Sequence, residues 1–393
     1  MGHERRLHRM KTPYYILNEN ELDASLNGFK SAIRSKCENS IPSYSVKTNS
    51  LPYIIKRAGQ MGYFAEVVSD DEYELALYCG FSKDRIVFNG PFKSKDVFID
   101  SIRNGSIVNI ETFRELEWLS QLPDDKVFEV GLRMNINISS ISPDDENHID
   151  DNSRFGFSCE SGDFDKAISI LQSLPNVHLN CIHIHRTSRT RSISFYSNLI
   201  DYALGELNKR GIKVRLIDIG GGYFGQMPGK PTYMEYASVI SDRIRAHHFE
   251  SSTVIIEPGN AIVASCLSFV TSVIDVKRHD DRFFITIDGS RIDVDPFFRK
   301  RDFFKSFIYE SEEGSIAPMQ IIGGCTCLEN DRLMELQNHR LLSIGDQIHF
   351  HRVGAYTMTL TPLFIRYWPE VYVKNDDGIK LVREKFDVKK LIK

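Results

Sequence analysis

The sequence lacks long apolar runs, a marked excess of one charge and any dense cluster of basic residues. No stretch approaches the roughly 18 apolar residues of a membrane-spanning helix, and no apolar segment follows the basic residues near the amino terminus. We therefore expect neither a membrane anchor nor an export signal. The 49 Lys and Arg residues nearly balance the 53 Asp and Glu residues, for a formal net charge of −4. This balance argues against nucleic acid or an anionic membrane as the main partner and leaves a small molecule as the expected ligand.

Cysteine is also scarce, with seven residues scattered over the 393 positions. An odd, dispersed set in a chain of this length favours free thiols in a reducing compartment, so we expect a cytoplasmic protein. Cys325 and Cys327 are separated by a single residue, but no second cysteine or histidine cluster with zinc-type spacing accompanies them. We expect no metal site.

Apolar residues make up 41% of the sequence, enough for a large core and about two domains. From residue 20 to about residue 248, short runs rich in Val, Ile and Phe alternate with longer amphipathic segments. The predicted strands are 43–47, 63–67, 85–88, 107–110, 130–136, 179–185, 214–219 and 253–257. The predicted helices are 20–33, 51–61, 70–78, 95–103, 112–122, 163–174, 195–209 and 233–247. This alternation predicts an α/β fold, a closed (β/α)8 barrel of the TIM type.

The pattern changes after about residue 264. Strand-like runs at 268–276, 282–287, 319–322, 346–350 and 370–373 follow one another with little helical spacing, which predicts a separate β domain. The expected organisation has three parts. An N-terminal segment, 1–19, packs with the β domain, a barrel spans 20–264, and the C-terminal β domain spans 265–393.

Four features follow predicted barrel strands, at the end of the barrel where active sites of this fold lie. Lys47 ends the first strand, His185 the sixth and Glu257 the eighth, and glycines 220–222 follow the seventh. Each has an ordinary structural explanation, since lysines are mostly solvated and glycines make turns. Their convergence on one end of the barrel favours a functional site.

This set matches the needs of pyridoxal 5'-phosphate (PLP). The cofactor requires a lysine for its imine, backbone amides for its phosphate, a flat group against its ring and a partner for its ring nitrogen. Gly221 and Gly222 would let the main chain approach the phosphate. A carboxylate at Glu257 would keep the ring nitrogen protonated, which makes the ring a strong electron sink.

Further blocks resemble a known family over nearly the whole chain. The sequence is similar to the PLP-dependent decarboxylases of the alanine-racemase-like barrel fold, the fold type III group that includes ornithine, arginine and diaminopimelate decarboxylases. The similar blocks are residues 12–15, 44–49, 66–69 with Glu72, 183–188, 220–222, 257–259, 324–327 with Asp331, and 354–357.

The resemblance implies a role for several residues. Lys47 forms the imine, His185 stacks on the pyridine, and Glu257 contacts the ring nitrogen. Cys327 reaches into the partner subunit's active site, so the resemblance also implies a homodimer with shared sites. The other implied cofactor residues are Glu66 beside the ring and, at the phosphate, Ser188, Gly221, Gly222 and Tyr356.

The chain departs from the family pattern near the phosphate. Asn260 stands where the family has an arginine that supports the phosphate, and Arg186 and Thr187 replace an apolar residue and a glycine. Part of the charge compensation is lost at Asn260. Our hypothesis is that Arg186 or Arg189 restores it from the neighbouring turn.

The chain also departs from the pattern where the family selects its substrate. Leu328 stands in place of an acidic residue that meets a distal amine, and Asp295 in place of the arginine with which diaminopimelate decarboxylases bind a distal carboxylate. Asp288 and Glu329 are further candidates for a distal amine. Candidates for a carboxylate are Arg291, Arg299 and His351. We expect a basic or conjugated amino acid, as in polyamine or siderophore biosynthesis, rather than plain diaminopimelate.

The expected reaction is α-decarboxylation, a lyase reaction that releases carbon dioxide and an amine. Cys327 or Lys47 would protonate the α-carbon, and the resemblance favours the cysteine. The alternative is a PLP-dependent racemase, against which Glu257 argues because barrel racemases commonly pair the ring nitrogen with arginine. A non-catalytic regulator derived from such an enzyme is a third hypothesis, and the presence of both Lys47 and Cys327 argues against it.

Overall fold

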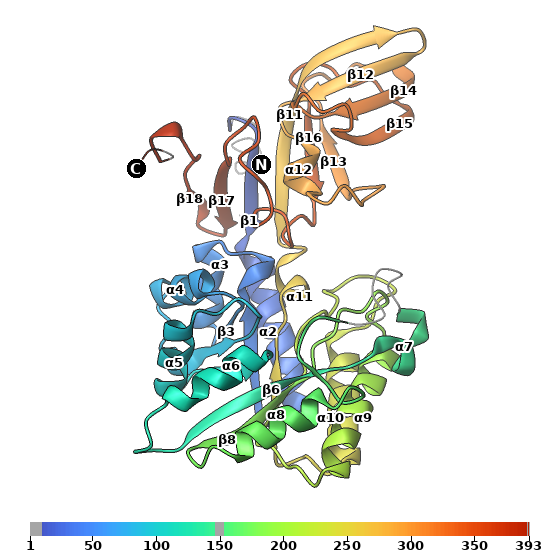
Figure 1. Cartoon of the computed structure of the whole chain (residues 1–393). Helices are drawn as coiled ribbons and strands as arrows, with labels where there is room; N and C mark the ends of the chain where they lie inside the picture. The colour runs from blue at the N-terminus through green and yellow to red at the C-terminus, as the bar shows by residue number, and fades with distance from the viewer. Residues whose placement is uncertain (1–9, 146–152, 391, 393) are drawn as a thin grey trace. The chain divides into compact units, whose positions relative to one another are not determined.

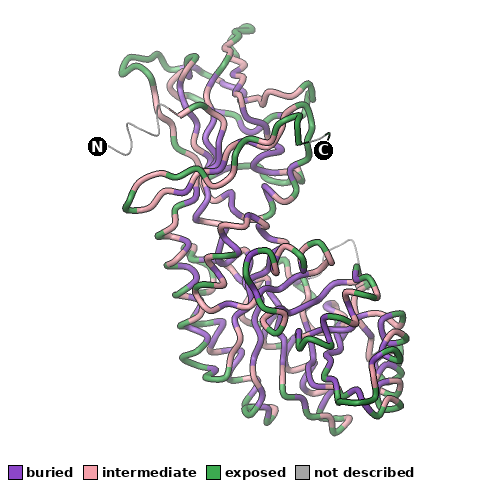
Figure 2. The backbone as a smooth tube through the Cα atoms, turned by 90° about the vertical axis from the view of Figure 1, so that its left-hand side faces the viewer, coloured by how far each residue is buried: buried purple, intermediate pink, exposed green. Residues whose placement is uncertain are grey.

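The computed structural model describes residues 10–145, 153–390 and 392, which divide into two compact units (Figure 1). One unit is Ser25–Ile262, and the other joins Met1–Ala24 to Val263–Lys393. In Figure 2 the strands inside both units are largely buried, whereas exposed positions recur along the helices. None of the helices in the described part of the chain combines the length and apolarity that a bilayer crossing requires.

Within the described residues, the first unit contains a closed barrel of eight parallel strands, which confirms the predicted fold class. Each strand pairs with its neighbour in parallel, and β10 returns to β2 through Val254 opposite Ser40. The barrel strands are β2 (Ser40–Ser45), β3 (Phe64–Val67), β4 (Ile86–Phe88), β5 (Ile107–Ile110), β6 (Phe128–Asn135), β8 (Val177–His183), β9 (Leu216–Asp218) and β10 (Thr253–Ile256). The two-residue strand β7 (Phe157–Ser158) adds to β6. β-Branched residues buried on these strands, such as Val87 and Ile255, form the core as parallel strands require.

Helices connect the barrel strands as the amphipathic pattern predicts. They are α2 (Glu19–Lys36), α3 (Pro52–Gln60), α4 (Asp70–Tyr78), α5 (Lys95–Arg103), α6 (Phe113–Trp118), α8 (Asp163–Gln172), α9 (Ile193–Lys209) and α10 (Tyr233–Ala246), with the short α7 (Ile138–Ile141) after β6. Local capping sets several of their starts. The side chains of Thr112 and Thr232 each accept a hydrogen bond from the backbone N–H of the Glu at the third helical position. The side chain of that Glu in turn accepts a hydrogen bond from the backbone N–H of the Thr.

Five barrel strands end earlier than the sequence predicts, and three of them leave a predicted site residue beyond the strand. Lys47 lies in a 3₁₀ turn, Val46–Thr48, and His185 lies two residues beyond the end of β8. Glu257 is the first residue after β10. At these positions the backbone leaves the hydrogen-bonding pattern that joins the parallel strands. After the first strand, Tyr44 Oη stabilises the turn by donating to Asn49 O at 2.8 Å.

The second unit is mainly β-sheet, with the short helix α12 (Arg291–Val294), and the short helix α11 (Asn260–Val263) lies where the chain passes from the first unit to the second. Its strands are β1 (Tyr14–Asn18), β11 (Leu267–His279), β12 (Arg282–Ile287), β13 (Lys305–Ile308), β14 (Ile316–Gly323), β15 (Arg332–Arg340), β16 (Gln347–His351), β17 (Glu370–Asn375) and β18 (Gly378–Arg383). Strand β1 lies between β11, to which it is antiparallel, and β17, to which it is parallel. Tyr15 on β1 packs against Phe269 on β11 with ring centroids 4.7 Å apart. The N-terminal strand is thus an interior strand of this sheet.

Candidate active site

Lys47 lies beside a buried carboxylate at the carboxyl end of β2. Its Nζ is 2.6 Å from Glu66 Oε2, and the Glu66 side chain is only 1% exposed. Ser45 Oγ donates to the same oxygen at 2.6 Å. Strands β2 and β3 pair at Ser45 and Glu66, so sheet register alone brings the carboxylate to the lysine. A lysine with a carboxylate at this distance has a proton acceptor in place, as imine chemistry requires.

Two asparagines that sequence reasoning missed extend this network across the barrel. Asn89 Nδ2 donates to Glu66 Oε1 at 3.2 Å and to Glu257 Oε1 at 2.5 Å. Asn109 Nδ2 donates to Asn89 Oδ1 at 2.8 Å and to Asp218 Oδ2 at 2.9 Å. Both asparagines are buried. In the sequence, Asn89 directly follows the apolar strand β4, and Asn109 is the polar residue within the otherwise apolar strand β5. These positions were the signal that could have identified them.

Glu257 and Asp218 are two buried carboxylates at the centre of the barrel. Burial, followed by the Asp218 charge, raises the pKa of Glu257 well above its usual range. Burial also raises the pKa of Asp218. An oxygen of each carboxylate and a ring nitrogen of His183 all lie within 4.8 Å of one another. The arrangement can hold a proton or a hydrogen-bonded heterocyclic nitrogen.

Two histidines stack at the carboxyl end of β8. The rings of His183 and His185 are 6.3 Å apart with an interplanar angle of 15°. Gly221 N donates to His185 Nδ1 at 3.1 Å, which fixes this ring and leaves its proton on Nε2. Burial lowers the pKa of both imidazoles well below the usual value. Both rings are therefore neutral, flat groups at neutral pH.

The turn after β9 requires its glycines. Gly220 has φ +78°, and a Cβ there would lie 2.4 Å from His185 Cβ. A Cβ on Gly221 would lie 2.5 Å from the backbone oxygen of Glu257. The backbone of this turn therefore reaches the ends of its neighbouring strands in a way that side chains would prevent. Gly220 N already donates to Asp218 Oδ1 and Gly221 N to His185 Nδ1, so an anion would have to be bound by N–H groups that follow in the turn.

Arg133 and Glu111 form a further buried pair near His185. Arg133 Nη1 lies 3.2 Å from Glu111 Oε2, and Arg133 Nη2 donates to His185 O at 3.4 Å. The bond from Arg133 to the backbone oxygen of His185 links the pair to the main chain that carries this histidine. Strands β5 and β6 bring it together, so the sequence did not reveal it.

Ser188 is engaged within its own loop. Its Oγ donates to Asp145 Oδ1 at 2.5 Å and accepts from Arg191 N at 2.6 Å. Thr190 N also donates to Asp145, and these bonds outweigh burial and lower the pKa of Asp145. Arg189 Nη2 donates to the backbone oxygen of Asp144 at 3.1 Å. The phosphate roles of Ser188, Arg186 and Arg189 stay predictions.

The remaining predicted site residues lie in the second unit. Cys327, Leu328, Glu329 and Tyr356 are all exposed there. Asp295 is buried, with Oδ2 at 2.9 Å from Arg291 Nη2 and 2.9 Å from Lys300 N. Asp288 accepts from Thr12 Oγ1 at 2.6 Å and from Ser272 N at 2.9 Å. Asp295 and Asp288 thus already take part in local hydrogen bonds.

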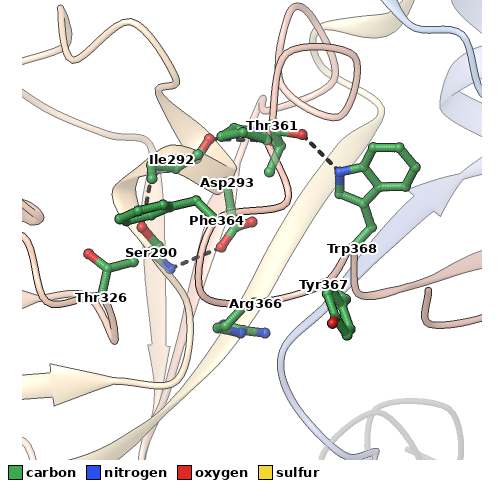
Figure 3. Close-up of a pocket in the computed structure, with 10 residues that line it drawn as sticks. Ser290, Ile292, Asp293, Thr326, Thr361, Phe364, Arg366, Tyr367 and Trp368 are labelled. Atoms are coloured by element: carbon green, nitrogen blue, oxygen red, sulfur yellow. Dashed lines mark hydrogen bonds between the residues drawn. The ribbon is translucent and has the colours of Figure 1, made fainter. Parts of the chain in front are cut away.

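A pocket in the second unit contains an arginine that the sequence analysis did not single out. Figure 3 shows Arg366 among the residues that line it, with Ser290, Asp293, Thr326, Tyr367 and Trp368 around it. Arg366 Nη1 donates to the backbone oxygen of Asp288 and lies 3.5 Å from Cys325 Sγ. Trp368 Nε1 donates to Thr361 O at 2.8 Å and fixes the indole. Arg366 places a positive charge beside the 324–327 block.

Glu72, at the start of α4, gives a test of the electrostatics beside Lys47. Burial, followed by the Glu66 charge, raises the pKa of Glu72 to about 7. Because the folded state binds this proton more tightly than the unfolded state, stability falls as pH rises from about 4.5 to about 7. Glu72→Gln should leave stability unchanged below this window and raise it by ~1–2 kcal/mol above it in urea unfolding.

The substitution keeps an acceptor for Val68 N, to which Glu72 Oε2 is bonded at 2.9 Å, so capping is retained. Asp71→Asn, at the exposed neighbouring position, is the control and should show no such pH window. An equal gain for Glu72→Gln at every pH would show that Glu72 is not protonated in the folded state.

A lysine after the first strand of an eight-stranded barrel, with a histidine, a glycine turn and a buried carboxylate on the later strands, defines a PLP-binding barrel. The residues fit the cofactor, because the glycine turn lies against His185 and Glu257 more closely than side chains would allow, and both nitrogens of buried His183 lack a hydrogen-bond partner among the described residues. The family described as pyridoxal-dependent decarboxylase, pyridoxal binding domain, matches residues 22–264. The chain belongs to this family and is a PLP-dependent amino-acid decarboxylase of fold type III.

Curated relatives and solved structures agree with this family. The chain is 25% identical to the probable chloroplastic diaminopimelate decarboxylase of rice, covering 96% of this chain and 78% of that protein. It is 23% identical to the diaminopimelate decarboxylase of Aquifex aeolicus, covering 95% and 89%. Diaminopimelate decarboxylase of Methanocaldococcus jannaschii in complex with L-lysine has the same fold, with a TM-score of 0.86, 22% identity, and coverage of 99% and 93%. Arginine decarboxylase of Paramecium bursaria Chlorella virus gives a TM-score of 0.77, 20% identity, and coverage of 94% and 97%.

Proposed function

We propose that the chain removes the α-carboxylate of a diamino acid of the diaminopimelate class. The observation that carries this proposal is the set of relatives named diaminopimelate decarboxylase, which align over 95% to 97% of the chain. These names point away from the sequence-based preference for a different basic or conjugated amino acid. They also do not favour the racemase or regulator hypotheses.

The barrel residues would have two roles, since some would bind the cofactor and others would accept or hold a proton. When bound, PLP supplies the electron sink that takes up the electron pair of the broken Cα–carboxylate bond. Lys47 would hold the cofactor, and Glu66, 2.6 Å from its Nζ, would accept the ammonium proton so that the amine becomes nucleophilic. His185 would lie flat against the ring, since Gly221 N fixes its orientation. Glu257 would bind the ring nitrogen.

The phosphate would be bound mainly by main chain. Gly222 would present its N–H group and Tyr356 would add a hydroxyl, whereas Gly221 N already donates to His185 Nδ1 and would have to exchange that bond for one to the phosphate. Ser188 already donates to Asp145, so its hydroxyl would have to exchange this bond for one to the phosphate. With Asn260 in place of the family arginine, Arg186 and Arg189 stay the candidates for the missing positive charge.

Diaminopimelate carries an ammonium and a carboxylate at each end, so its distal end needs groups of both signs. Asp295 supplies no positive charge, and its carboxylate is already bound by Arg291. We propose Arg366, whose Nη1 lies 3.5 Å from Cys325 Sγ in the 324–327 block, as the ligand of the distal carboxylate, with Glu329 or Asp288 as the partner of the distal ammonium.

A second candidate is a basic or conjugated amino acid that lacks a free distal carboxylate. The observation that favours it is the pair of departures at Asp295 and Leu328. The Leu328 side chain is 39% exposed, so it can contact a ligand. An apolar or acylated distal group would contact it favourably.

A substrate panel with detection of carbon dioxide tests the proposal. The panel contains meso-diaminopimelate, lysine, ornithine, arginine and acylated diamino acids. Fastest release from diaminopimelate supports the first candidate, and Arg366→Gln should then raise KM for diaminopimelate by ~10-fold or more while lysine turnover is unchanged. Release only from a conjugated amino acid would overturn it in favour of the second. Arg282→Gln, at an exposed position of the second unit that is not among the substrate candidates, is the control.

A homodimer with shared sites gives a separate prediction. If Cys327 acts in the partner's barrel, Lys47→Ala and Cys327→Ala chains are each inactive alone but complement each other when mixed. Random reassortment should then recover about a quarter of the wild-type activity. About half of the dimers are mixed, and each mixed dimer has one intact site out of two. Refolding the two variants together and assaying carbon dioxide release measures this. Absence of any recovery, with mixed dimers verified by mass, would contradict shared sites.

A further inference from the structure

Three carboxylates are buried together at the centre of the barrel. Glu66, Asp218 and Glu257 are each at most 3% exposed. They come from or directly follow β3, β9 and β10. Such a concentration of negative charge in a low-dielectric interior is costly unless cations or protons compensate it.

Two asparagine amides join the three carboxylates into one network. Asn89 Nδ2 bonds Glu66 and Glu257, and Asn109 Nδ2 bonds Asp218 and the oxygen of Asn89. An amide donates hydrogen bonds but carries no charge. The asparagines therefore orient the carboxylates without neutralising them.

Lys47 neutralises one of the three. Its ammonium is 2.6 Å from Glu66, which leaves Asp218 and Glu257 to be compensated otherwise. His183 Nε2 lies 3.8 Å from Glu257 Oε2, beyond a normal hydrogen bond, and burial, then Arg133 and other nearby cations, lowers the pKa of this ring. A neutral His183 contributes no charge.

The other groups around the pair do not supply a cation either. Cys181 and Tyr223 lie close to both carboxylates, and burial raises the pKa of each, so both stay neutral. Among the other described cations nearby, Arg133 pairs with Glu111 and Lys93 with Glu115. Two adjacent carboxylates with no cation of their own hold a proton between them, because like charges at this distance disfavour double ionisation.

The hydrogen bonds indicate which carboxyl carries the proton. Asp218 accepts from two N–H groups, Gly220 N at 3.0 Å and Asn109 Nδ2 at 2.9 Å, and donors of this kind favour the ionised form. Among the hydrogen bonds of the described residues, Glu257 accepts from one amide, Asn89 Nδ2. Glu257 is therefore the better place for the proton, and Asp218 the better acceptor.

We propose that Asp218 and Glu257 share one proton in the cofactor-free protein, and that Asp218 is the positioning residue that keeps it on Glu257 for delivery to the ring nitrogen of PLP. In the delivery step the O–H bond of Glu257 breaks and an N–H bond of the ring forms, without oxidation or reduction. Glu257 is left as a carboxylate against the protonated ring. Asp218 stays ionised, bonded to Gly220 N and Asn109. The proposal rests on PLP binding but not on the identity of the substrate.

Infrared spectroscopy of the cofactor-free protein tests the shared proton directly. At pH 8.5, where Glu72 with its pKa of about 7 is ionised, the wild type should still show the carbonyl stretch of a protonated carboxylic acid. This band should disappear in Glu257→Gln, which keeps the acceptor for Asn89, and persist in Glu66→Gln, the matched control from the same network. Asp218→Asn should also lose it, because the pKa of Glu257 falls once the neighbouring charge is removed. Absence of the band in the wild type, or its persistence in Glu257→Gln, would overturn the proposal.

Counting protons during PLP binding tests the delivery. Calorimetry in buffers of different ionisation enthalpy, above the pKa of the free ring nitrogen, gives the number of protons taken up per cofactor. Asp218→Asn should take up about one proton more than the wild type, since the stored proton is missing. Equal uptake would overturn the delivery step. If Asp218→Asn does not fold, Glu257→Gln and Glu66→Gln decide the question by infrared alone, and neither measurement depends on decarboxylation.

Discussion

Replacing Lys47 with alanine is expected to abolish carbon dioxide release and the covalent attachment of PLP together. Lys47 is the lysine at the carboxyl end of the first barrel strand, 2.6 Å from the Glu66 carboxylate. Without the amine the imine cannot form, so we expect turnover to fall by about 10³-fold or more. The measurements are carbon dioxide release and the visible absorption of the imine.

Borohydride reduction followed by peptide mapping identifies the attached lysine. Lys56→Ala is the control, since Lys56 is exposed on α3 and should leave both activity and absorption unchanged. A label on any lysine other than Lys47 would contradict the assignment.

Replacing Lys93 with alanine is expected to cost ~3–5 kcal/mol of folding free energy. The Lys93 ammonium lies 3.0 Å from Glu115 Oε1, and both side chains are fully buried. It also donates to the backbone oxygens of Gly90 and Asn109. Its removal leaves a buried carboxylate and two carbonyls without this donor. Urea unfolding followed by circular dichroism measures the loss.

The comparison variant is Lys83→Ala, which breaks the exposed pair between Lys83 and Asp100 and should cost only ~0–1 kcal/mol. A double change, Lys93→Met with Glu115→Gln, should recover part of the stability, because no buried charge then remains and the Gln side chain still accepts from Glu111 N and Thr112 N. A Lys93→Ala cost as small as that of Lys83→Ala would mean that water or another cation reaches Glu115.

The periodicity of the sequence was sufficient to predict the barrel. Short apolar runs alternating with amphipathic segments identified each barrel strand, because buried parallel strands leave that composition and the helices that cover them leave another. The ends of the strands were predicted less accurately than their positions, because no residue type marks where the hydrogen bonding between two strands stops. The 3₁₀ turn at Lys47 depends on a bond from Tyr44 to Asn49 that only the fold reveals.

The second unit was predicted less completely. The strands β13, β15 and β18 were missed, because their burial patterns mix exposed and buried positions and leave weak alternation in the sequence. The pairing of β1 with β17 joins residues more than 350 positions apart, which no local pattern encodes.

By itself the sequence determined the class of fold and the order of the motifs, because local composition and spacing record them, and the family resemblance supplied the lysine and the carboxylate proposed to serve the cofactor. Only the tertiary structure decided that Asn89, Asn109 and Asp218 meet Glu66 and Glu257, since barrel closure brings together residues from strands far apart in the chain. It also decided that Asp295 is bound to Arg291 and that Arg366 lies in the pocket beside Thr326. The proton balance of the site depends on these contacts, because charge interactions follow distance in space.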